Sequence, residues 1–373
     1  MDLSNVRIRE HFGLVSNDTH TGKFGFLVSP PKNRGGVEKN DYVIVDHPLY
    51  GESCPMLSVI TEITSYEEVA GSTIGDKMGK MFATAEIIGY IDLRNENKPI
   101  CEVLVPPNPG TRVYIPLKKF LEDILNRNTK GEKFKTPIQI GMFKNSSVED
   151  PENHGFIKCF IDAQDFTSKN SIIAAGPGTG KTCLAKLLLK EISGKTSSQI
   201  ILFDSYNEYF GATDSTKKIE LKGKTDEDSL TKTIKKGQIT VLNAQGMTLE
   251  EKRSTFLESL QTILKLRLEQ KIMPQFLIIE EAENLKGEVL NQAVIEGRKI
   301  GISICLLTTN PSELGSKVLS QMGYQIIGKT TNKEDTAYLS NMAGTTNTST
   351  DLAVGDWIIY GIGNNRPTKV CLT

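Results

Sequence analysis

The sequence lacks any apolar run long enough to cross a membrane. Its N-terminus, MDLSNVRIREHFG, also lacks the apolar core of a secretory signal. These two absences predict a cytoplasmic protein with no membrane partner.

Cysteine and histidine are too scattered to suggest a disulfide framework or a metal site. The six cysteines include no C-x-x-C pair and mostly lie in apolar runs, and the four histidines are equally dispersed. Zinc sites and disulfide scaffolds both depend on closely spaced ligands. We therefore expect the cysteines to behave as small buried apolar residues.

A surplus of charge of either sign is also missing, because 44 Lys and Arg residues balance 45 Asp and Glu residues. A protein that coats nucleic acid carries a broad basic surface, and this balance disfavours that class. The balance is compatible with a ring of subunits that gathers a few lysines along a narrow channel. A length of 373 residues suits two domains.

The first part of the chain is typical of a small β-barrel. From Phe24 to about Pro116, short β segments alternate with turns rich in proline and glycine. Pro116 to Asn128 predicts one connecting helix, and Gly131 to Thr136 a polar connector. We assign residues 1–150 to this barrel domain and residues 151–373 to a second domain.

From about Phe156 onward, strand and helix patterns alternate, which predicts an α/β domain with a mainly parallel sheet. Most of the predicted strands are apolar on both faces, as buried parallel strands are. They cover 171–175, 199–204, 239–244, 276–280, 302–309 and 324–328. Thr248 and Glu251 form a capping box that predicts a helix from Leu249 to Gln270.

The strand SIIAA runs directly into a glycine loop and then into the helix CLAKLLLKEI. Backbone N–H groups of such a loop and the positive end of the following helix cradle phosphate groups, so this order predicts a P-loop that binds ATP. We expect Lys181 to reach the β- and γ-phosphates and the Thr182 hydroxyl to bind Mg²⁺. The predicted nucleotide-binding residues are Gly176, Pro177, Gly178, Thr179, Gly180, Lys181, Thr182 and Cys183.

Two adjacent acids end another buried strand, FLII, and these are Glu280 and Glu281. Ligands of open α/β sheets bind at the carboxyl ends of the strands, so both acids are expected beside the phosphates. We expect Glu280 to help hold Mg²⁺ and Glu281 to polarise the attacking water. Together with the P-loop, the acid pair predicts a RecA-like ATPase.

Asp204 ends the predicted strand QIILFD and leaves two interpretations open. If that strand lies beside the glycine-loop strand, Asp204 and Glu208 lie near the phosphates. The alternative is a structural role for Asp204 as a cap of the following turn.

Several separate motifs then fall in an order that resembles one family. These are LFDSYNEY, FLIIEEAENL, IEGRKIGISICLLTTNPSELGSKVLSQ and the C-terminal GDWIIYGIGNNRPTKV. They resemble the HerA helicase and translocase family, a relative of FtsK, over nearly the whole chain.

This resemblance implies an N-terminal HAS-barrel-like domain and a homo-hexameric ring that translocates double-stranded DNA with ATP and Mg²⁺. It also implies a NurA-like nuclease as partner in DNA-end processing. Carried over by position, Asp204 and Glu281 assist hydrolysis, and Arg298 is an arginine finger for a neighbour's ATP.

The chain departs from the family pattern in the span between the glycine loop and Glu281, which is short for the family, and at two further sites. Lys169 and Asn170 stand where relatives have an Arg-His pair, and Thr308-Thr309-Asn310-Pro311 stands where relatives read S-Q-R-P. The second change removes the glutamine expected to sense the γ-phosphate, and Asn310 or Thr309 is left as its replacement.

Other functions remain open at this stage. The same chemistry serves a viral or mobile-element DNA-packaging motor, a ring ATPase that remodels proteins, or a slow nucleotide-dependent scaffold. The basic stretch Lys217, Lys218, Lys222 and Lys224 is either a channel-facing loop or a solvated charged loop.

Overall fold

The computed structural model describes residues 5–7, 10–29, 37–66, 80–144, 156–213, 216–220, 227–234, 239–337, 352–361 and 368–371. The chain forms two compact units. The first comprises Met1–Lys133, Met142–Cys159 and Ile362–Arg366, and the second comprises Phe134–Gly141, Phe160–Gly361 and Pro367–Thr373. None of the helices in these described ranges combines the length and apolarity that a membrane crossing requires.

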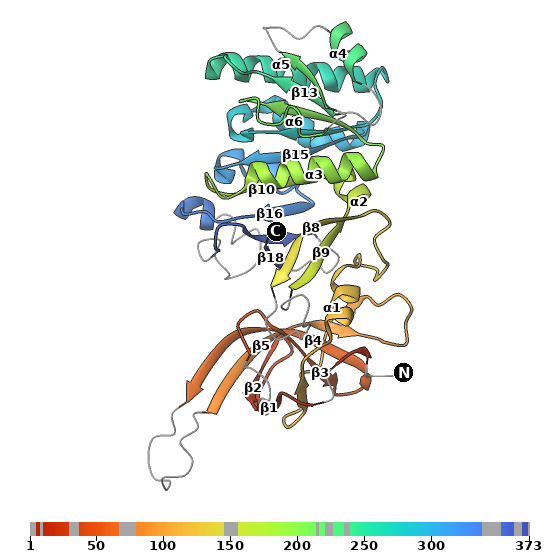
Figure 1. The fold of residues 1–373 in the computed structure, drawn as a ribbon, viewed down its shortest axis with the longest axis vertical. Helices are drawn as coiled ribbons and strands as arrows, with labels where there is room; N and C mark the ends of the chain where they lie inside the picture. The colour runs from red at the N-terminus through yellow and green to blue at the C-terminus, as the bar shows by residue number, and fades with distance from the viewer. Residues whose placement is uncertain are drawn as a thin grey trace. The chain divides into compact units, whose positions relative to one another are not determined.

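The first unit contains a closed six-stranded barrel, as the closely spaced β segments predict (Figure 1). Its strand order is β2-β1-β7-β3-β4-β5, and antiparallel pairing of β2 with β5 closes the ring. The short β6 pairs antiparallel with the end of β5. The strands are β1 Gly13–Thr19, β2 Lys23–Val28, β3 Tyr42–His47, β4 Gly51–Tyr66, β5 Lys80–Ile91, β6 Ile100–Cys101 and β7 Arg112–Tyr114.

Apolar side chains from these strands fill the barrel interior, including Phe24, Phe26, Val43 and Met56. A single helix, α1 (Lys118–Leu125), lies in the segment predicted as the connecting helix. Its Phe120, Leu121, Ile124 and Leu125 are buried, and this i, i+1, i+4, i+5 spacing forms one apolar stripe.

The second unit is built on a mixed sheet of eleven strands in the order β12-β13-β11-β14-β15-β10-β16-β17-β18-β8-β9. The seven strands from β12 to β16 are parallel, and β17 and β18 continue the sheet as an antiparallel pair. The strands are β8 Pro137–Lys144, β9 Phe156–Asp162, β10 Ser171–Ala174, β11 Gln199–Asp204, β12 Thr216–Glu220, β13 Ile239–Asn243, β14 Gln275–Ile279, β15 Ile302–Thr308, β16 Tyr324–Ile327, β17 Asp356–Tyr360 and β18 Thr368–Cys371. Strand β8 lies ahead of residue 150 and nevertheless belongs to this sheet.

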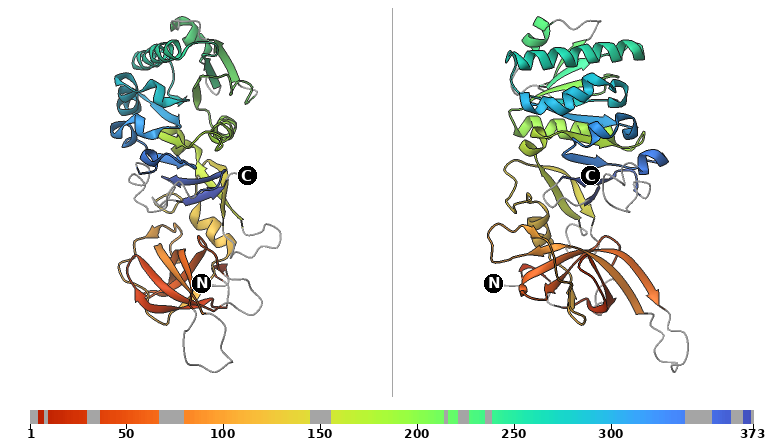
Figure 2. Two further views of the ribbon diagram at one scale, coloured as in Figure 1. Left: turned by 90° about the vertical axis from the view of Figure 1, so that its left-hand side faces the viewer. Right: turned by 180° about the vertical axis from the view of Figure 1, so that it is seen from behind.

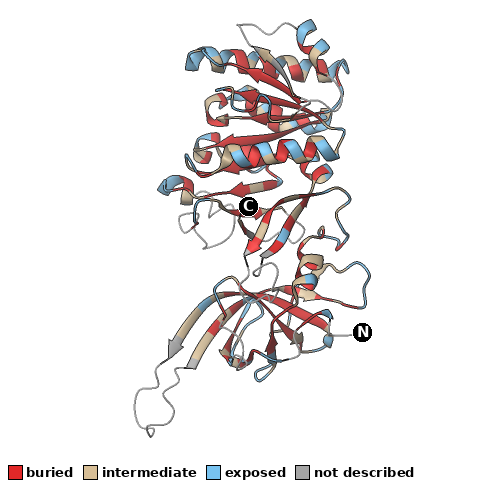
Figure 3. Ribbon diagram, viewed as in Figure 1, coloured by how far each residue is buried: buried red, intermediate tan, exposed pale blue. Residues whose placement is uncertain are grey.

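Helices cover both faces of the parallel part of the sheet. Helices α5 (Leu249–Leu268) and α6 (Glu288–Glu296) lie on one face, and α3 (Lys181–Lys195) lies on the other (Figure 2). The strands between them are buried on both sides, whereas the outer faces of the helices are exposed (Figure 3). The predicted capping box is present, because Thr248 Oγ1 accepts the Glu251 N–H at 3.3 Å and Glu251 Oε2 accepts the Thr248 N–H at 2.8 Å.

The strand order overturns one expectation about Asp204. Strand β11, which ends at Asp204, is separated from the glycine-loop strand β10 by β14 and β15. The two strands are not neighbours, so Asp204 does not lie directly beside the glycine loop. Periodicity identifies strands but carries no information about which strands are neighbours.

Candidate active site

The glycine loop between β10 and α3 has the backbone geometry that a phosphate cradle needs. Gly178 and Gly180 have φ values of 71° and 104°, in the left-handed region where a side chain is disfavoured. The Thr179 hydroxyl donates to the Gly176 carbonyl at 2.6 Å, which braces the loop from inside. The loop delivers the chain to the start of α3, where the first N–H groups of a helix have no intrahelical partner and attract anions.

The buried Trp357 of β17 lies against this loop. A methyl group added at Gly180 would lie 3.8 Å from Trp357 Cζ2, and one at Gly328 would lie 2.9 Å from Cζ3. Gly328 follows β16, the strand beside β10, so the indole fills the space between the loop and the sheet.

Lys181 stands at the first position of α3 and points back across its own loop. Its Nζ donates to the carbonyl oxygens of Ala175 and Gly176, at 2.6 and 3.1 Å. Burial lowers the pKa of Lys181, and the carboxylates of Glu283, Glu280 and Glu281 oppose that change. The lysine is thus held close to three acids.

These residues meet at one cavity of about 170 Å³ at the carboxyl end of the parallel strands. The cavity gathers one lysine, four glutamates, two tyrosines and three threonines. Its lining is Lys181, Thr182, Tyr206, Glu208, Tyr209, Glu280, Glu281, Glu283, Leu307, Thr308 and Thr309. Lys181, Thr182, Glu280 and Glu281 are among the residues that sequence reasoning selected.

Glu280 follows β14 directly and is held by the loop that follows β11. Its Oε2 accepts the Ser205 N–H at 3.3 Å, and its Oε1 accepts the Tyr209 hydroxyl at 3.4 Å. Burial, and then the carboxylates of Asp204 and Glu208, raise the pKa of Glu280 to about 8. A cation beside this oxygen cluster would relieve the repulsion among the acids.

Glu281 has an unusual backbone for a residue other than glycine, with φ 48° and ψ 48°. Left-handed backbone at such a residue persists only where the surrounding structure imposes it, and such residues cluster at functional sites. Glu281 Oε2 accepts the Asn284 Nδ2 donor at 3.1 Å. Burial raises the pKa of Glu281, and a hydrogen bond from Tyr206 opposes that rise.

The donor set fits Mg²⁺ that is shared with a nucleotide. Within the described ranges, no group of three or more His, Cys, Asp and Glu residues forms a ready-made metal cage. Mg²⁺ usually takes one or two protein oxygens and completes its shell with phosphate and water. The Thr182 hydroxyl and the Glu280 carboxylate line the same cavity and supply oxygens of that kind.

Asp204 is fully buried and does not line the cavity. Its carboxylate accepts the N–H groups of Tyr206, Glu208 and Tyr209, each at 3.1 Å. Asp204 therefore holds the turn that carries Tyr206 and Glu208 into the cavity. This arrangement matches the capping interpretation. It also places the Asp204 carboxylate close enough to Glu280 to raise the pKa of Glu280.

Other residues of the predicted set lie outside the cavity lining. Cys183 is exposed on α3. Asn170 is buried at the start of β10, where its side chain donates to the Val294 carbonyl at 2.8 Å and accepts the Ile304 N–H at 3.0 Å. Lys169 pairs with Asp165 at 2.8 Å. The departure at Lys169 and Asn170 therefore serves packing at the opposite end of β10 from the glycine loop.

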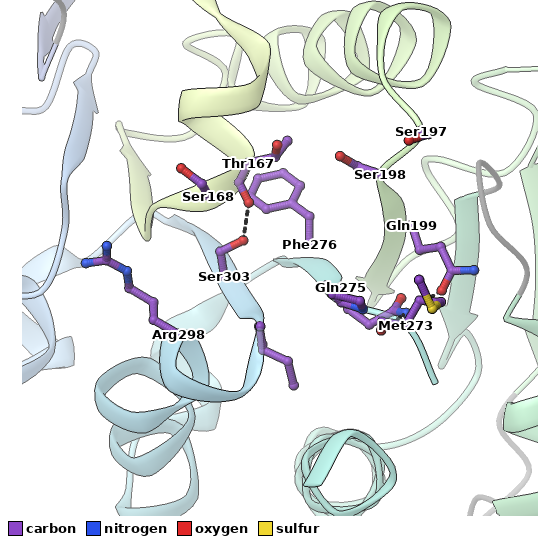
Figure 4. Close-up of a pocket in the computed structure, with 13 residues that line it drawn as sticks. Thr167, Ser168, Ser197, Ser198, Gln199, Met273, Gln275, Phe276, Arg298 and Ser303 are labelled. Carbon is purple, nitrogen blue, oxygen red and sulfur yellow. Dashed lines mark hydrogen bonds between the residues drawn. The ribbon is translucent and has the colours of Figure 1, made fainter. Parts of the chain in front are cut away.

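Arg298 lies at the end of the sheet where the parallel strands begin, and its own glycine loop lies at the opposite end. It borders a second cavity of about 510 Å³, together with the starts of β11, β14 and β15 (Figure 4). Its side chain is exposed, and in the described part of the chain the guanidinium has no hydrogen-bond or ion-pair partner. Glu296, the alternative partner, instead accepts a hydrogen bond from Gln292 at 3.1 Å.

The structure adds three site residues that the sequence did not reveal, namely Tyr206, Tyr209 and Glu283, and it decides between the two candidates for the missing glutamine. Thr309 lines the cavity, and Asn310 does not. In the sequence, the only signal for these residues is their position shortly after a predicted strand or after the two acids. Lys217 and Lys218 lie in β12, the edge strand of the sheet, while Lys222 and Lys224 fall outside the described residues.

Comparison with known proteins shows which sequences and structures the chain resembles in this region. Residues 138–296 match the family model for the central domain of the helicase HerA. Over 162 residues the chain is 34% identical to a probable helicase of Methanocaldococcus jannaschii, covering 37% of this chain and 31% of that protein.

Over 159 residues the chain is 30% identical to the DNA double-strand break repair helicase HerA of Sulfolobus acidocaldarius, covering 37% of this chain and 32% of that protein. The chain thus spans about a third of the length of these two relatives.

Among solved structures, the genome packaging NTPase B204 from Sulfolobus turreted icosahedral virus 2 has a TM-score of 0.45 and 16% identity. That likeness covers 56% of this chain and 99% of B204. VirB4 of Thermoanaerobacter pseudethanolicus has a TM-score of 0.47 and 13% identity, over 65% of this chain and 97% of its own.

Proposed function

We propose that this chain hydrolyses ATP with Mg²⁺ at the cavity lined by Lys181 and Glu281, and that a ring of six copies uses the energy to move along double-stranded DNA. One observation carries the proposal. A glycine loop, its lysine and two strand-terminal glutamates meet at the carboxyl end of a parallel sheet, and the same region matches the HerA central domain.

Each residue then takes a role from its position. Lys181 neutralises the β- and γ-phosphates, and the N–H groups at the start of α3 bind the same anion. Thr182 and Glu280 hold Mg²⁺, which supplies charge neutralisation to the phosphates. Glu281 accepts a hydrogen bond from the attacking water and orients it, with its own carboxylate fixed by Asn284.

Arg298 completes the site of a neighbouring subunit rather than its own. Its exposed guanidinium has no partner among the described residues, and it lies at the edge of the sheet away from its own Lys181. A planar guanidinium suits the stabilisation of charge on a phosphoryl group in the transition state.

The DNA substrate and the partner rest on relatives. The relative in Sulfolobus acidocaldarius is a helicase of DNA double-strand break repair. We propose that this chain likewise works on duplex DNA in end processing, and that its barrel binds a NurA-like nuclease. The closed barrel has a packed apolar core and contains none of the residues of the ATP cavity.

A salt titration of duplex-stimulated ATPase activity tests the DNA proposal. Contacts between basic side chains and DNA phosphates release counterions, so the affinity for duplex DNA should fall by about 10³-fold between 50 and 200 mM salt for a protein with six or more such contacts. Stimulation of the ATPase by duplex DNA should weaken steeply over the same range. The basal ATPase rate is the internal control. Hydrolysis that ignores duplex DNA at every salt concentration would favour a ring that remodels proteins.

A further inference from the structure

Tyr209 is a buried tyrosine in the lining of the ATP cavity. It lies in the turn after β11, and only 1% of its surface is exposed. It lines the cavity together with Thr182 and Glu280. A buried tyrosine needs a hydrogen-bond partner for its hydroxyl group, so the partners of Tyr209 indicate what it does.

The Tyr209 hydroxyl lies between the two residues proposed to hold Mg²⁺. It donates a hydrogen bond to Glu280 Oε1 at 3.4 Å. Burial raises the pKa of Tyr209, and a hydrogen bond with the Thr182 side chain opposes that rise. Thr182 belongs to helix α3, whereas Glu280 follows strand β14. Tyr209 therefore joins two ligand-bearing elements that are distant in the sequence.

The chemistry of these groups fixes the direction of the hydrogen bonds. A tyrosine hydroxyl has a single proton, and Tyr209 gives that proton to Glu280. The Tyr209 oxygen can only accept in its other bond, so the Thr182 hydroxyl donates to it. Because the Thr182 proton is engaged by Tyr209, the remaining lone pair of the Thr182 oxygen is left for a cation.

The backbone and the ring of Tyr209 are held by contacts that do not involve its hydroxyl. The Tyr209 N–H donates to Asp204 Oδ2 at 3.1 Å. The Lys186 Nζ lies 5.8 Å from the centre of the Tyr209 ring, within the range of a cation–π contact. Lys186 is four residues after Thr182 and shares its face of α3. Removal of the hydroxyl alone should therefore leave the ring in place.

We propose that Tyr209 is a positioning residue for Mg²⁺, whose hydroxyl orients the Thr182 hydroxyl and the Glu280 carboxylate so that both present oxygen atoms to the cation. This inference rests on the proposed ATPase function. Mg²⁺ requires nearly ideal octahedral geometry, so the orientation of each protein oxygen matters. Residues that orient metal ligands in this way commonly contribute about 10- to 100-fold to metal affinity.

The test compares the affinity of a non-hydrolysable ATP analogue in Mg²⁺ with its affinity in EDTA, both measured by calorimetry on the full chain. The ratio of the two affinities is the contribution of the cation. Tyr209→Phe should lower this ratio about 10-fold. The affinity in EDTA should stay at the wild-type value, because the lost hydroxyl contacts the cation ligands. Binding in EDTA also shows that the variant is folded.

Tyr324→Phe is the matched control. Tyr324 is another buried tyrosine whose hydroxyl donates to a carboxylate, that of Asp165. It lies at the start of β16, at the opposite end of the parallel strands from the ATP cavity. The ratio should be unchanged in Tyr324→Phe. An equal decrease in both variants would show a general effect of losing a buried hydroxyl and would overturn the inference.

The remaining outcomes separate this inference from the proposed function. An unchanged ratio in Tyr209→Phe, or equal losses of affinity in Mg²⁺ and in EDTA, would overturn the role of Tyr209 and leave the ATPase proposal intact. If the wild-type chain binds the analogue under neither condition, the proposed function fails and the inference fails with it. Wild-type binding that Mg²⁺ does not strengthen would overturn the cation roles of Thr182, Glu280 and Tyr209 together.

Discussion

A cavity lies at each end of the parallel strands, and the smaller of the two carries more charge. The carboxyl edge is the end where the strands finish, and the amino edge is the end where they begin. The cavity at the carboxyl edge has about 170 Å³ and is lined by five ionisable Lys and Glu residues. The cavity at the amino edge has about 510 Å³, and Arg298 is the only charged residue in its lining. Cavity volume alone would therefore direct attention to the wrong edge.

Chain direction explains the difference. Parallel strands bring their carboxyl ends, and the turns that follow them, to one edge, so acids placed after β14 and in the turn after β11 converge there. Helix α3 begins at this edge, and its positive end faces the same cavity. The amino edge receives strand starts and the ends of α2 (Ala163–Ser168) and α3, where exposed carbonyl groups disfavour an anion.

The contrast between the two edges is tested most strongly by asking whether a residue of the amino edge takes part in ATP hydrolysis. Arg298→Ala should lower ATP turnover about 1,000-fold, because an arginine finger contributes that much or more. Mixing this variant with Lys181→Ala subunits should restore part of the activity, since some sites in mixed rings combine an intact Lys181 with a neighbour's intact Arg298. Lys299→Ala, at the exposed neighbouring position, is the control.

Two outcomes of this mixing experiment are decisive. Full activity of Arg298→Ala alone would remove Arg298 from the reaction. An inactive variant whose mixed rings form but stay inactive would place its action within its own subunit.

At the carboxyl edge, Lys181→Ala should lower ATP turnover about 100- to 1,000-fold. The variant removes the lysine of the glycine loop, which is also the only lysine or arginine in the cavity lining. Lys190→Ala changes an exposed lysine on the same helix and should be neutral. Steady-state hydrolysis in the Lys181 variant near the wild-type rate would refute the assignment of this cavity.

Glu281→Gln should lower turnover about 100-fold while ATP still binds, because the amide keeps the shape of the side chain and loses most of its basicity. Single-turnover rates and ATP affinity separate the two effects. A parallel loss of binding and turnover in Glu281→Gln would show that this residue holds the nucleotide instead of the water.

The smallest expected effect concerns stability without Mg²⁺. Because the pKa of Glu280 is raised to about 8, the folded chain holds a proton that the unfolded chain has lost, and stability falls as pH rises from about 4.5 to 8. Glu280→Gln removes this dependence, so in EDTA its Tm should exceed that of the wild type by several degrees at pH 9. The advantage should shrink toward pH 5.

The exposed Glu258→Gln on α5 controls for the loss of one negative charge. A Tm difference that is constant from pH 5 to pH 9 would contradict the raised pKa of Glu280.

The strongest sequence signals were local ones. The run from Ser171 to Thr182 predicted strand, loop and helix, and the structure confirms all three. Thr248 and Glu251 predicted the start of α5 correctly, because a capping box involves only four consecutive residues. The barrel was foreseeable because apolar segments and turn residues alternate at short intervals.

Features that depend on distant parts of the chain escaped sequence reasoning. Strand β1 ends in the polar run Ser16 to Thr19, and β12 carries Lys217 and Lys218, so neither has the apolar pattern of a buried strand. The contact between Glu283 and Thr309 joins residues 26 positions apart through strand order. A single sequence contains no signal for such a pairing.

Trp357 gives the site an optical property of its own. It is the single tryptophan among 373 residues, it is 1% exposed, and it lies against the glycine loop. All indole emission from the protein therefore originates beside the phosphate cradle, and its buried Nε1 has no hydrogen-bond partner among the described residues. Nucleotide binding at Gly180 and Lys181 can thus be followed by intrinsic fluorescence without any label, and the Lys181→Ala variant serves as the blank.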